Sequence, residues 1–206
     1  PMTGESKKIH ADSDDAWLDV RSELEWMGKN ERLLWLSEKD GWRRINLVTR
    51  SGEKVTGITP AGFDVIDIKG VDNQNDYIYF MASPDDPKRR YLYRIKGDGS
   101  EMARVTPGNV SGMNSYNISP DCSLAVHTFS TFDTPPVIAL IKLPSHEVVK
   151  VLRDNANLTD QFKLLARRPV EFFRINIGGD VLLDGWSLTP PDFDKSKKYP
   201  VIVYVY

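Results

Sequence analysis

Short apolar runs, rich in β-branched and aromatic residues, alternate with clusters of Gly, Pro, Asp and Ser along most of the chain. This pattern is typical of β-strands joined by tight turns. The predicted strands are residues 33–36, 45–48, 54–58, 77–80, 91–95, 102–105, 124–126, 137–141 and 148–152. When the second strands of successive groups are aligned, the pattern repeats about every 45 residues, which is within the range of a four-stranded propeller blade.

The turn residues repeat together with the strands. Polar loops at 37–41, 83–86 and 130–133 each follow a second strand, and turns at 51–52 and 97–100 predict hairpins between third and fourth strands. A four-stranded antiparallel blade cannot bury both faces alone, and blades that stack radially supply the missing partners. The sequence therefore predicts a mainly β fold, with about three blades over roughly residues 20–168. A β-sandwich with a coincidental repeat is the alternative that the pattern leaves open.

The pattern changes after residue 152. Residues 157–165 have apolar positions at helical spacing after an N-cap-like Thr159-Asp160, which predicts a short helix or turn. Two strands, 171–177 and 181–188, are predicted to pair through a hairpin at 178–180. The last run, 199–206, is continuously apolar, as in a parallel strand that is covered on both faces. We therefore expect residues 1–168 to be propeller blades and residues 169–206 to open a second, α/β domain whose remainder lies beyond this chain.

Charge and composition narrow the function classes. The 27 basic and 29 acidic side chains give a net charge of −2, which provides no global attraction to phosphate backbones or anionic lipids. No uncharged apolar stretch approaches the roughly 18 residues that span a bilayer. We expect no nucleic-acid partner and no membrane span in this segment.

The residues that most often carry metal or redox chemistry are few. The only cysteine, Cys122, excludes an internal disulfide and is interpreted as a small residue in a turn. The three histidines, His10, His127 and His146, have no metal-ligand spacing, and each is interpreted as an ordinary surface or half-buried residue. We therefore expect no metal and no cofactor.

A family resemblance lies at the C-terminal end. Residues 190–206, Pro-Pro-Asp-Phe-Asp-Lys-Ser-Lys-Lys-Tyr-Pro followed by an apolar strand ending in Val-Tyr, closely resemble the segment where relatives of dipeptidyl peptidase IV pass from propeller to catalytic domain. The blades, including residues 37–43, also resemble the propeller of that family. The resemblance implies a serine exopeptidase of the prolyl oligopeptidase clan, which releases N-terminal X-Pro or X-Ala dipeptides. It also implies that the final segment opens an α/β-hydrolase domain.

Only one catalytic residue follows from this resemblance. It places the oxyanion-stabilising tyrosine of the family at Tyr206, where a neutral O–H donor would stabilise the tetrahedral intermediate. Tyr204, two residues earlier on the same strand face, is the competing assignment. Ser187 lies in a Gly-Trp-Ser sequence but in a strand of a predicted hairpin, so we reject it as the nucleophile. No Asp and His follow it in the order that the hydrolase triad requires, so we expect this chain alone to be inactive.

The residues that would bind the substrate cannot be assigned. Nothing matches the family's paired glutamates for the peptide N-terminus, and Glu23 and Glu25 are interpreted as a solvated strand edge. Arg21 is a possible match to a pocket arginine and stays unassigned. The basic residues at 43–44 and 88–90 are interpreted as loop charges.

Two function classes remain in competition. The first is a segment of a peptidase that acts on peptides, with a homodimer compatible with the resemblance; the second is a propeller that binds peptides or proteins without catalysis. The single cysteine favours a bacterial protein of the periplasm or the extracellular space, because animal relatives carry several disulfides in this region.

Overall fold

The computed structural model describes residues 4–19, 24–179 and 181–205. Its contacts divide the chain into two compact units, Pro1–Asp154 and Asn155–Tyr206, which are described separately. Arg21, Glu23 and Tyr206 lie outside the described residues.

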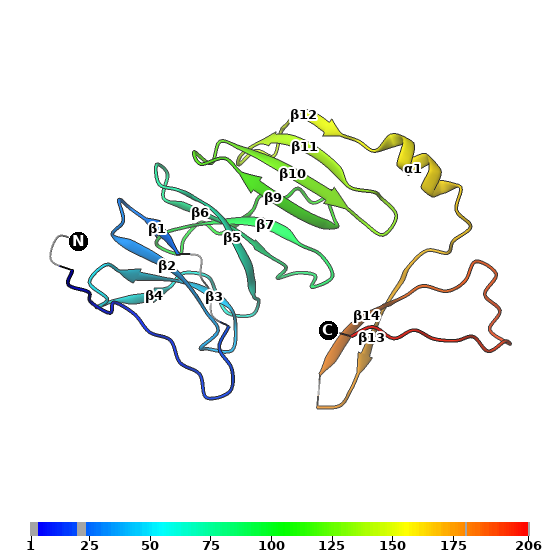
Figure 1. The fold of residues 1–206 in the computed structure, drawn as a ribbon, viewed down its shortest axis with the longest axis horizontal. Coiled ribbons are helices and arrows are strands. Elements are labelled where there is room, and N and C mark those ends of the chain that lie inside the picture. Colours follow the sequence, from blue (N-terminus) through cyan, green and yellow to red (C-terminus); the bar gives the residue numbers. More distant parts are fainter. Residues whose placement is uncertain (1–3, 20–23, 180, 206) are drawn as a thin grey trace. The chain divides into compact units, whose positions relative to one another are not determined.

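The first unit consists of three four-stranded antiparallel sheets that follow one another along the chain (Figure 1). Sheet 1 contains β1 (Glu25–Met27), β2 (Arg32–Ser37), β3 (Arg44–Thr49) and β4 (Val55–Gly57). Sheet 2 contains β5 (Val65–Asp72), β6 (Tyr77–Ala82), β7 (Tyr91–Lys96) and β8 (Ala103–Arg104). Sheet 3 contains β9 (Met113–Ile118), β10 (Leu124–Ser130), β11 (Val137–Lys142) and β12 (Val148–Arg153). Neighbouring strands within each sheet are consecutive in sequence, so the predicted four-stranded blade is confirmed.

The repeat aligns equivalent strands, as the sequence predicts. Trp35, Tyr79 and Val126 lie on β2, β6 and β10, the second strands of the three sheets. No strand is shared between two of these sheets. The sandwich alternative, which needs shared strands, is therefore wrong for this unit.

The central sheet is buried on both faces, and this stacks the three blades. On β6, Ile78, Phe80 and Ala82 belong to a first core with sheet 1, and the alternate residues belong to a second core with sheet 3. The first core is Met27, Leu34, Ile45, Leu47, Ile58, Phe63, Val65, Ile78, Phe80, Ala82, Tyr91, Tyr93 and Ile95. The second core is Tyr77, Tyr79, Met81, Leu92, Val105, Tyr116, Cys122, Ala125, Ala139 and Ile141. Strand alternation thus sends successive side chains of one strand into two different interfaces.

Each hairpin between a third and a fourth strand contains a residue with a left-handed backbone. In sheets 1 and 2 the hairpin includes a glycine, Gly52 and Gly99, with φ of 80° and 86°. Sheet 3 has His146 in its hairpin, with φ of 58°. Glycine adopts this conformation without a Cβ clash, whereas other residues reach it at a cost. The left-handed backbone of the turn thus explains the two glycines. It does not explain the histidine in the third hairpin.

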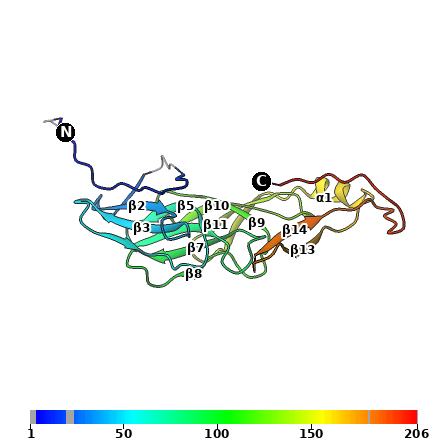
Figure 2. The same ribbon diagram turned by 90° about the horizontal axis from the view of Figure 1, so that it is seen from below.

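A segment ahead of β1 packs on sheet 1. Lys7 donates to the carbonyl oxygen of Ser51 at 3.1 Å, and the His10 ring contacts Trp35 edge-on with centroids 5.1 Å apart. A Cβ at Gly52 would lie 2.2 Å from the carbonyl oxygen of Ile9, so glycine is required for this approach. Figure 2 shows the segment running along the outside of sheet 1.

The second unit begins with the short helix that the sequence predicts. Helix α1 spans Ala156–Lys163, and its N-cap residue is Asn155. The expected Thr159-Asp160 start is wrong, because Thr159 already lies inside the helix and its N–H and hydroxyl both donate to the carbonyl oxygen of Asn155. An intrahelical partner four residues earlier shows that the helix begins before Thr159.

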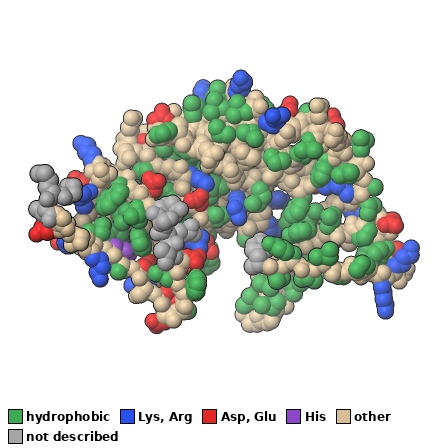
Figure 3. Space-filling view, viewed as in Figure 1, with side chains coloured by type: hydrophobic (Ala, Val, Ile, Leu, Met, Phe, Trp, Pro, Cys, Tyr) green, Lys and Arg blue, Asp and Glu red, His purple; other side chains and the backbone are tan. Residues whose placement is uncertain are grey.

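The predicted hairpin is confirmed as β13 (Glu171–Asn176) paired with β14 (Leu182–Ser187). Arg174 makes a two-point ion pair with Asp184 across the strands, at 2.7 and 3.1 Å. Apolar side chains are exposed on both faces of this hairpin, including Phe173 and Ile175 on one face and Trp186 on the other. Figure 3 shows hydrophobic side chains at the surface of this unit on the side that faces the viewer. A two-stranded sheet cannot bury its own faces. Part of the apolar surface of this hairpin is therefore left exposed by the rest of the second unit.

The last apolar run does not form the predicted strand among the described residues. Residues 201–205 have no assigned strand, and their exposed fractions range from 78% to 97%. A β-strand requires the backbone of a neighbouring strand to complete its hydrogen bonds. Composition favours a buried strand here, but the described part of the chain supplies no paired neighbour.

Candidate functional site

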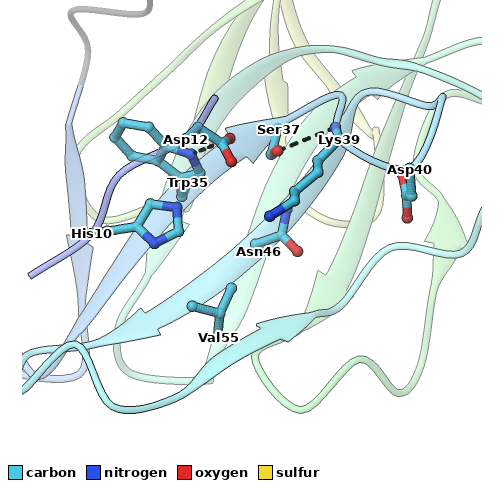
Figure 4. Close-up of a pocket in the computed structure, with 8 residues that line it drawn as sticks. All are labelled: His10, Asp12, Trp35, Ser37, Lys39, Asp40, Asn46 and Val55. Carbon is cyan, nitrogen blue, oxygen red and sulfur yellow. Dashed lines mark hydrogen bonds between the residues drawn. The ribbon is translucent and has the colours of Figure 1, made fainter. Parts of the chain in front are cut away.

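A pocket of about 270 Å³ lies on the outer side of sheet 1 (Figure 4). It lies between the segment ahead of β1 and the strands β2, β3 and β4. Its lining residues are His10, Asp12, Trp35, Ser37, Lys39, Asp40, Asn46 and Val55.

Asp12 is the most constrained charged group of this pocket. The indole Nε1–H of Trp35 donates to its Oδ2 at 3.0 Å. Burial raises the pKa of Asp12, but hydrogen bonds from Ser37 and Trp35 and the charges of His10 and Lys39 outweigh this, so the pKa lies below its usual value. The carboxylate is therefore ionised at neutral pH and holds the N-terminal segment on sheet 1.

The pocket has no nucleophile–base pair. The Ser37 hydroxyl is engaged with the Asp12 carboxylate and accepts the backbone N–H of Lys39 at 3.3 Å. Among the described residues, no serine is hydrogen-bonded to an imidazole. A serine activated by a histidine would show that contact.

The arginines beside this pocket are held in ion pairs. Arg43 contacts Glu38 at 2.5 Å and Asp19 at 3.4 Å. Arg44 contacts Asp40 at 2.5 Å and donates to the carbonyl oxygen of Thr59 at 2.7 Å. These ion pairs stabilise the loop after β2, which agrees with the interpretation of Arg43 and Arg44 as loop charges.

The loop after β6 is held in a similar way. Lys88 lies 3.0 Å from Asp86, and Arg89 lies 3.7 Å from the same carboxylate. These charges also agree with the loop-charge interpretation.

His127 and His146 are the main departure from the sequence interpretation. They are 6% and 8% exposed, and their ring centroids lie 4.8 Å apart. Tyr116 stacks on His127 at 4.6 Å, and its hydroxyl lies 2.9 Å from His146 Nε2. The interpretation of ordinary surface or half-buried residues is therefore wrong for this pair, since the second core encloses both rings.

Burial controls the ionisation of the two histidines. It lowers the pKa of His127 to about 4, with a further contribution from the charge of His146. It also lowers the pKa of His146, against an opposing hydrogen bond to its own backbone. Both rings are thus neutral at pH 7.

Sequence spacing could not place these residues together, because 18 residues, which include strand β11, lie between the two histidines. The available signal was the left-handed backbone of His146 in its hairpin, a conformation that glycine adopts in the hairpins of the other two sheets. A non-glycine residue at such a position indicates a side chain with a specific role.

The remaining candidates are not reactive centres. Cys122 is buried in the second core, and burial followed by the charges of Asp72 and Asp121 raises its pKa to about 11. Its N–H donates to the carbonyl oxygen of Ser119 in a turn, which confirms the turn interpretation. Ser187 lies within β14 opposite Glu171, and not on a strand-to-helix turn. Its predicted position in a hairpin strand is confirmed.

The residues expected from the family resemblance lie mainly outside the described structure. The assignment of Tyr206 and the possible role of Arg21 both stay predictions. Glu25 begins β1 and is exposed, as expected for a strand edge. Tyr204 is 78% exposed.

No group of three or more His, Cys, Asp or Glu suited to a metal ion occurs in the described part of the chain. None of its helices is long and apolar enough to cross a bilayer.

Comparison with known proteins gives consistent matches. Residues 1–136 match the family described as the dipeptidyl peptidase IV N-terminal region. A "Probable dipeptidyl peptidase 4" of Aspergillus flavus is 22% identical over 201 residues, which cover 95% of this chain and 26% of that protein. A "Probable dipeptidyl-aminopeptidase B" of Neosartorya fischeri is 30% identical over 157 residues, which cover 72% of this chain and 16% of that protein.

A solved structure shows the same fold. The crystal structure of Porphyromonas gingivalis dipeptidyl peptidase 4 matches with a TM-score of 0.76 and 27% identity, over 86% of this chain and 24% of that one. The chain thus spans about a quarter of the length of that protein and of the Aspergillus flavus relative.

Proposed function

The chain belongs to the dipeptidyl peptidase IV N-terminal region family, and we propose that it serves as propeller scaffold and domain junction in a serine-type dipeptidyl peptidase. The relatives are named dipeptidyl peptidases and dipeptidyl-aminopeptidases. The proposed substrates are peptides with a free N-terminus, from which the longer protein releases X-Pro or X-Ala dipeptides.

One observation carries this proposal. The chain forms three sequential four-stranded sheets with a doubly buried central sheet, and 86% of it matches the crystal structure of Porphyromonas gingivalis dipeptidyl peptidase 4 with a TM-score of 0.76. Such sheets are rigid because each interface is a packed apolar core. A rigid stack of this kind suits the task of shaping an entrance to an adjoining catalytic domain.

Within this proposal residues 169–206 start the hydrolase domain. The exposed apolar faces of β13 and β14 and the exposed run 201–205 need neighbours to be buried. A catalytic α/β domain would supply parallel strands and helices for them. The chain itself then contributes one group to the chemistry, the Tyr206 hydroxyl, as a donor to the oxyanion.

We propose that the 206-residue chain alone does not cleave peptides. Covalent catalysis needs a nucleophile, a base in contact with it and a group that orients the base. No described serine contacts an imidazole, and Tyr206 has no intermediate to stabilise without the other groups.

The test compares this chain with a longer gene product that continues past residue 206. Both are incubated with Gly-Pro-p-nitroanilide, with and without a serine-directed phosphonate. Release of p-nitroaniline by the longer product alone, blocked by the phosphonate, is the expected result. Phosphonate-sensitive release by the 206-residue chain would overturn its proposed inactivity. A longer product that binds Gly-Pro peptides without cleaving them would establish the binding-module alternative instead.

We further propose a periplasmic or extracellular location for the longer protein. The single, buried Cys122 is compatible with an oxidising compartment because no exposed thiol is available among the described residues. Fractionation of the source cells and immunodetection of the protein would test this, and detection only in the cytosol would contradict it.

A further inference from the structure

Two buried histidines join sheets 2 and 3 through a chain of hydrogen bonds. The Leu92 N–H donates to the Thr106 hydroxyl oxygen at 2.7 Å, and that hydroxyl lies 2.8 Å from the Tyr116 hydroxyl. The Tyr116 hydroxyl in turn lies 2.9 Å from His146 Nε2. Leu92 belongs to sheet 2, whereas Tyr116 and His146 belong to sheet 3 and its hairpin. The chain therefore crosses the interface between the two sheets.

A neutral His146 completes this chain of hydrogen bonds. The Thr106 hydroxyl accepts the Leu92 N–H and has one proton, which it can donate to the Tyr116 oxygen; the Tyr116 O–H can then donate to an unprotonated Nε2 of His146. A proton on this Nε2 would reverse the bonds, because the imidazole would donate to Tyr116 and Tyr116 would donate to Thr106. The buried Thr106 O–H would then have no acceptor among these groups.

His127 is also held as a neutral ring. The amide nitrogen of Asn114 donates to the carbonyl oxygens of Arg90, Val110 and Gly112, at 2.9, 3.3 and 3.3 Å. The Asn114 Oδ1 therefore faces His127 Nε2, at 2.7 Å, and accepts its proton. This places the proton of the neutral ring on Nε2. A second proton would go to Nδ1, whose charge would lie against the Tyr116 ring and the His146 ring.

The backbone at His146 indicates that the imidazole is there for its contacts. Its φ of 58° is the conformation that Gly52 and Gly99 adopt in the equivalent hairpins. A residue with a Cβ is strained in this conformation relative to glycine. The hydrogen bond to Tyr116 and the burial of the ring offset that strain only while the ring is neutral.

The charged groups on the surrounding elements do not favour a protonated imidazole. Arg104 of β8 donates to the carbonyl oxygen of Thr106 and adds a positive charge on the sheet 2 side. On the hairpin of His146, Glu147 is paired with Lys142 at 3.1 Å. Arg90, whose carbonyl accepts from Asn114, is a further cation. No carboxylate of the described residues contributes to the pKa of either imidazole, and burial lowers both.

The first core does not depend on this pair. Its residues come only from sheets 1 and 2 and the connection between them, whereas Tyr116 and its neighbours belong to the second core. Packed cores of this kind open as separate units with different free energies. Disruption of the second interface therefore leaves the contact between sheets 1 and 2 in place.

We propose that His127 and His146 form an acid-sensitive junction between sheets 2 and 3, which is closed while both rings are neutral and opens locally when they are protonated. The lowered pKa values set the window. An unfolded histidine binds its proton near pH 6.5, whereas His127 in the closed junction binds it near pH 4. The junction is therefore fully stable above pH 6.5, weakens as the pH falls towards 4, and loses nothing further below that.

Cys122 is a built-in reporter of this junction. It is the single cysteine, it is 5% exposed, and it lies in the second core. The test measures its modification by 4,4′-dithiodipyridine between pH 7.5 and pH 4, relative to free cysteine at each pH. Backbone amide signals of β2 and β3 in a ¹⁵N-labelled chain report the first core in the same samples.

We expect the relative rate at Cys122 to rise on the order of 50-fold between pH 7 and pH 4.5, because each pKa difference of one corresponds to a tenfold change in equilibrium. The signals of β2 and β3 should stay at their folded positions over this range. A constant relative rate would overturn the proposal. Loss of the β2 and β3 signals at the same pH as the rate increase would also overturn it, since the transition would then be global.

The variants His127→Gln and His146→Gln keep a donor and an acceptor, respectively, but do not titrate. Each should reduce the acid-dependent rise at least fivefold, whereas His10→Gln, on sheet 1, should leave it unchanged. An unchanged rise in both variants would overturn the proposal. If a variant already exposes Cys122 at pH 7, the imidazole NMR titration of the unmodified chain decides. If His127 and His146 titrate over the same pH range in which Cys122 becomes exposed, the junction is supported. If they titrate at a different pH, the proposal is contradicted.

Discussion

Thr59 and Thr106 make the same hydrogen bond in adjacent sheets. Each hydroxyl oxygen accepts a backbone N–H from the third strand of its sheet, 14 residues earlier in both cases. The donors are Ile45, at 3.0 Å, and Leu92, at 2.7 Å. Both threonines are 1% exposed and each precedes a proline. The bond satisfies a strand N–H where the fourth strand ends, so each threonine closes its own sheet. Among the described residues, the Thr106 hydroxyl alone of the two has a second partner, the Tyr116 hydroxyl of the next sheet.

Replacing Thr106 by Val should destabilise the first unit. The change keeps the volume, leaves the buried Leu92 N–H without its partner, and removes one of the two hydrogen bonds of the Tyr116 hydroxyl, which keeps His146. An orphaned N–H costs about 1–3 kcal/mol and a lost hydrogen bond about 1 kcal/mol more, so we expect a loss of about 2–4 kcal/mol in the free energy of unfolding. Urea unfolding followed by circular dichroism measures this.

Thr59→Val is the matched control. It orphans only the Ile45 N–H and should cost about 1–2 kcal/mol. If the two variants lost equal stability, the bond between Thr106 and Tyr116 would contribute nothing to the contact between sheets 2 and 3.

Phe80→Ala should be strongly destabilising. Phe80 is fully buried in the first core and stacks on Tyr93 with ring centroids 5.9 Å apart. Truncation of a buried phenylalanine leaves a cavity and costs about 3–5 kcal/mol. Phe132→Ala, at a side chain that is 43% exposed on the same unit, should cost less than about 1 kcal/mol. Comparable losses in urea unfolding would show that the core does not have the packing described.

The Asp121 carboxylate provides a test of local electrostatics. Hydrogen bonds from the hydroxyls of Ser119 and Ser123, at 2.6 and 2.8 Å, lower its pKa to about 2, together with the Ser123 N–H. A lowered pKa means that the turn is stabilised above about pH 4 and loses this stabilisation as the pH falls towards 2. The Ser119→Ala, Ser123→Ala double variant should raise the pKa towards 3.8 in a ¹³C-carboxyl NMR titration. If the pKa of Asp121 stays near 2 in this variant, backbone hydrogen bonds rather than the two hydroxyls lower it.

Tyr206→Phe tests the proposed catalytic role in the longer protein. The change keeps the ring and removes only the O–H donor. We expect kcat to fall by about 10²- to 10³-fold with a much smaller change in KM, because the lost bond strengthens only as charge develops on the oxyanion. Steady-state kinetics with Gly-Pro-p-nitroanilide measures both constants.

Tyr204→Phe is the control on the same segment. It should leave kcat near that of the unmodified protein. If Tyr204→Phe is the crippling change and Tyr206→Phe is not, the oxyanion donor lies one pleat repeat earlier. If neither matters, the family assignment fails at its single catalytic residue in this chain.

The sequence by itself determined the sheets of this protein. Strand alternation, as along β6, and turn residues such as Gly52 and Gly99 depend on residues that are close together in sequence. Strand positions, hairpins and the blade repeat could therefore be predicted. The end of the chain shows the limit of such local information. Residues 201–205 have the composition of a covered strand, but a strand also needs a neighbouring backbone, which composition does not specify.

Tertiary structure alone decided the junction between sheets 2 and 3. The junction is built from four different segments, which contribute Thr106, Tyr116, His127 and His146. No residue near any one of them in sequence predicts the other three. They meet because two sheets stack face to face and exclude water from the space between them. The same exclusion sets the chemistry of the pair, since a histidine that titrates near neutral pH in water stays neutral where its charged form cannot be solvated.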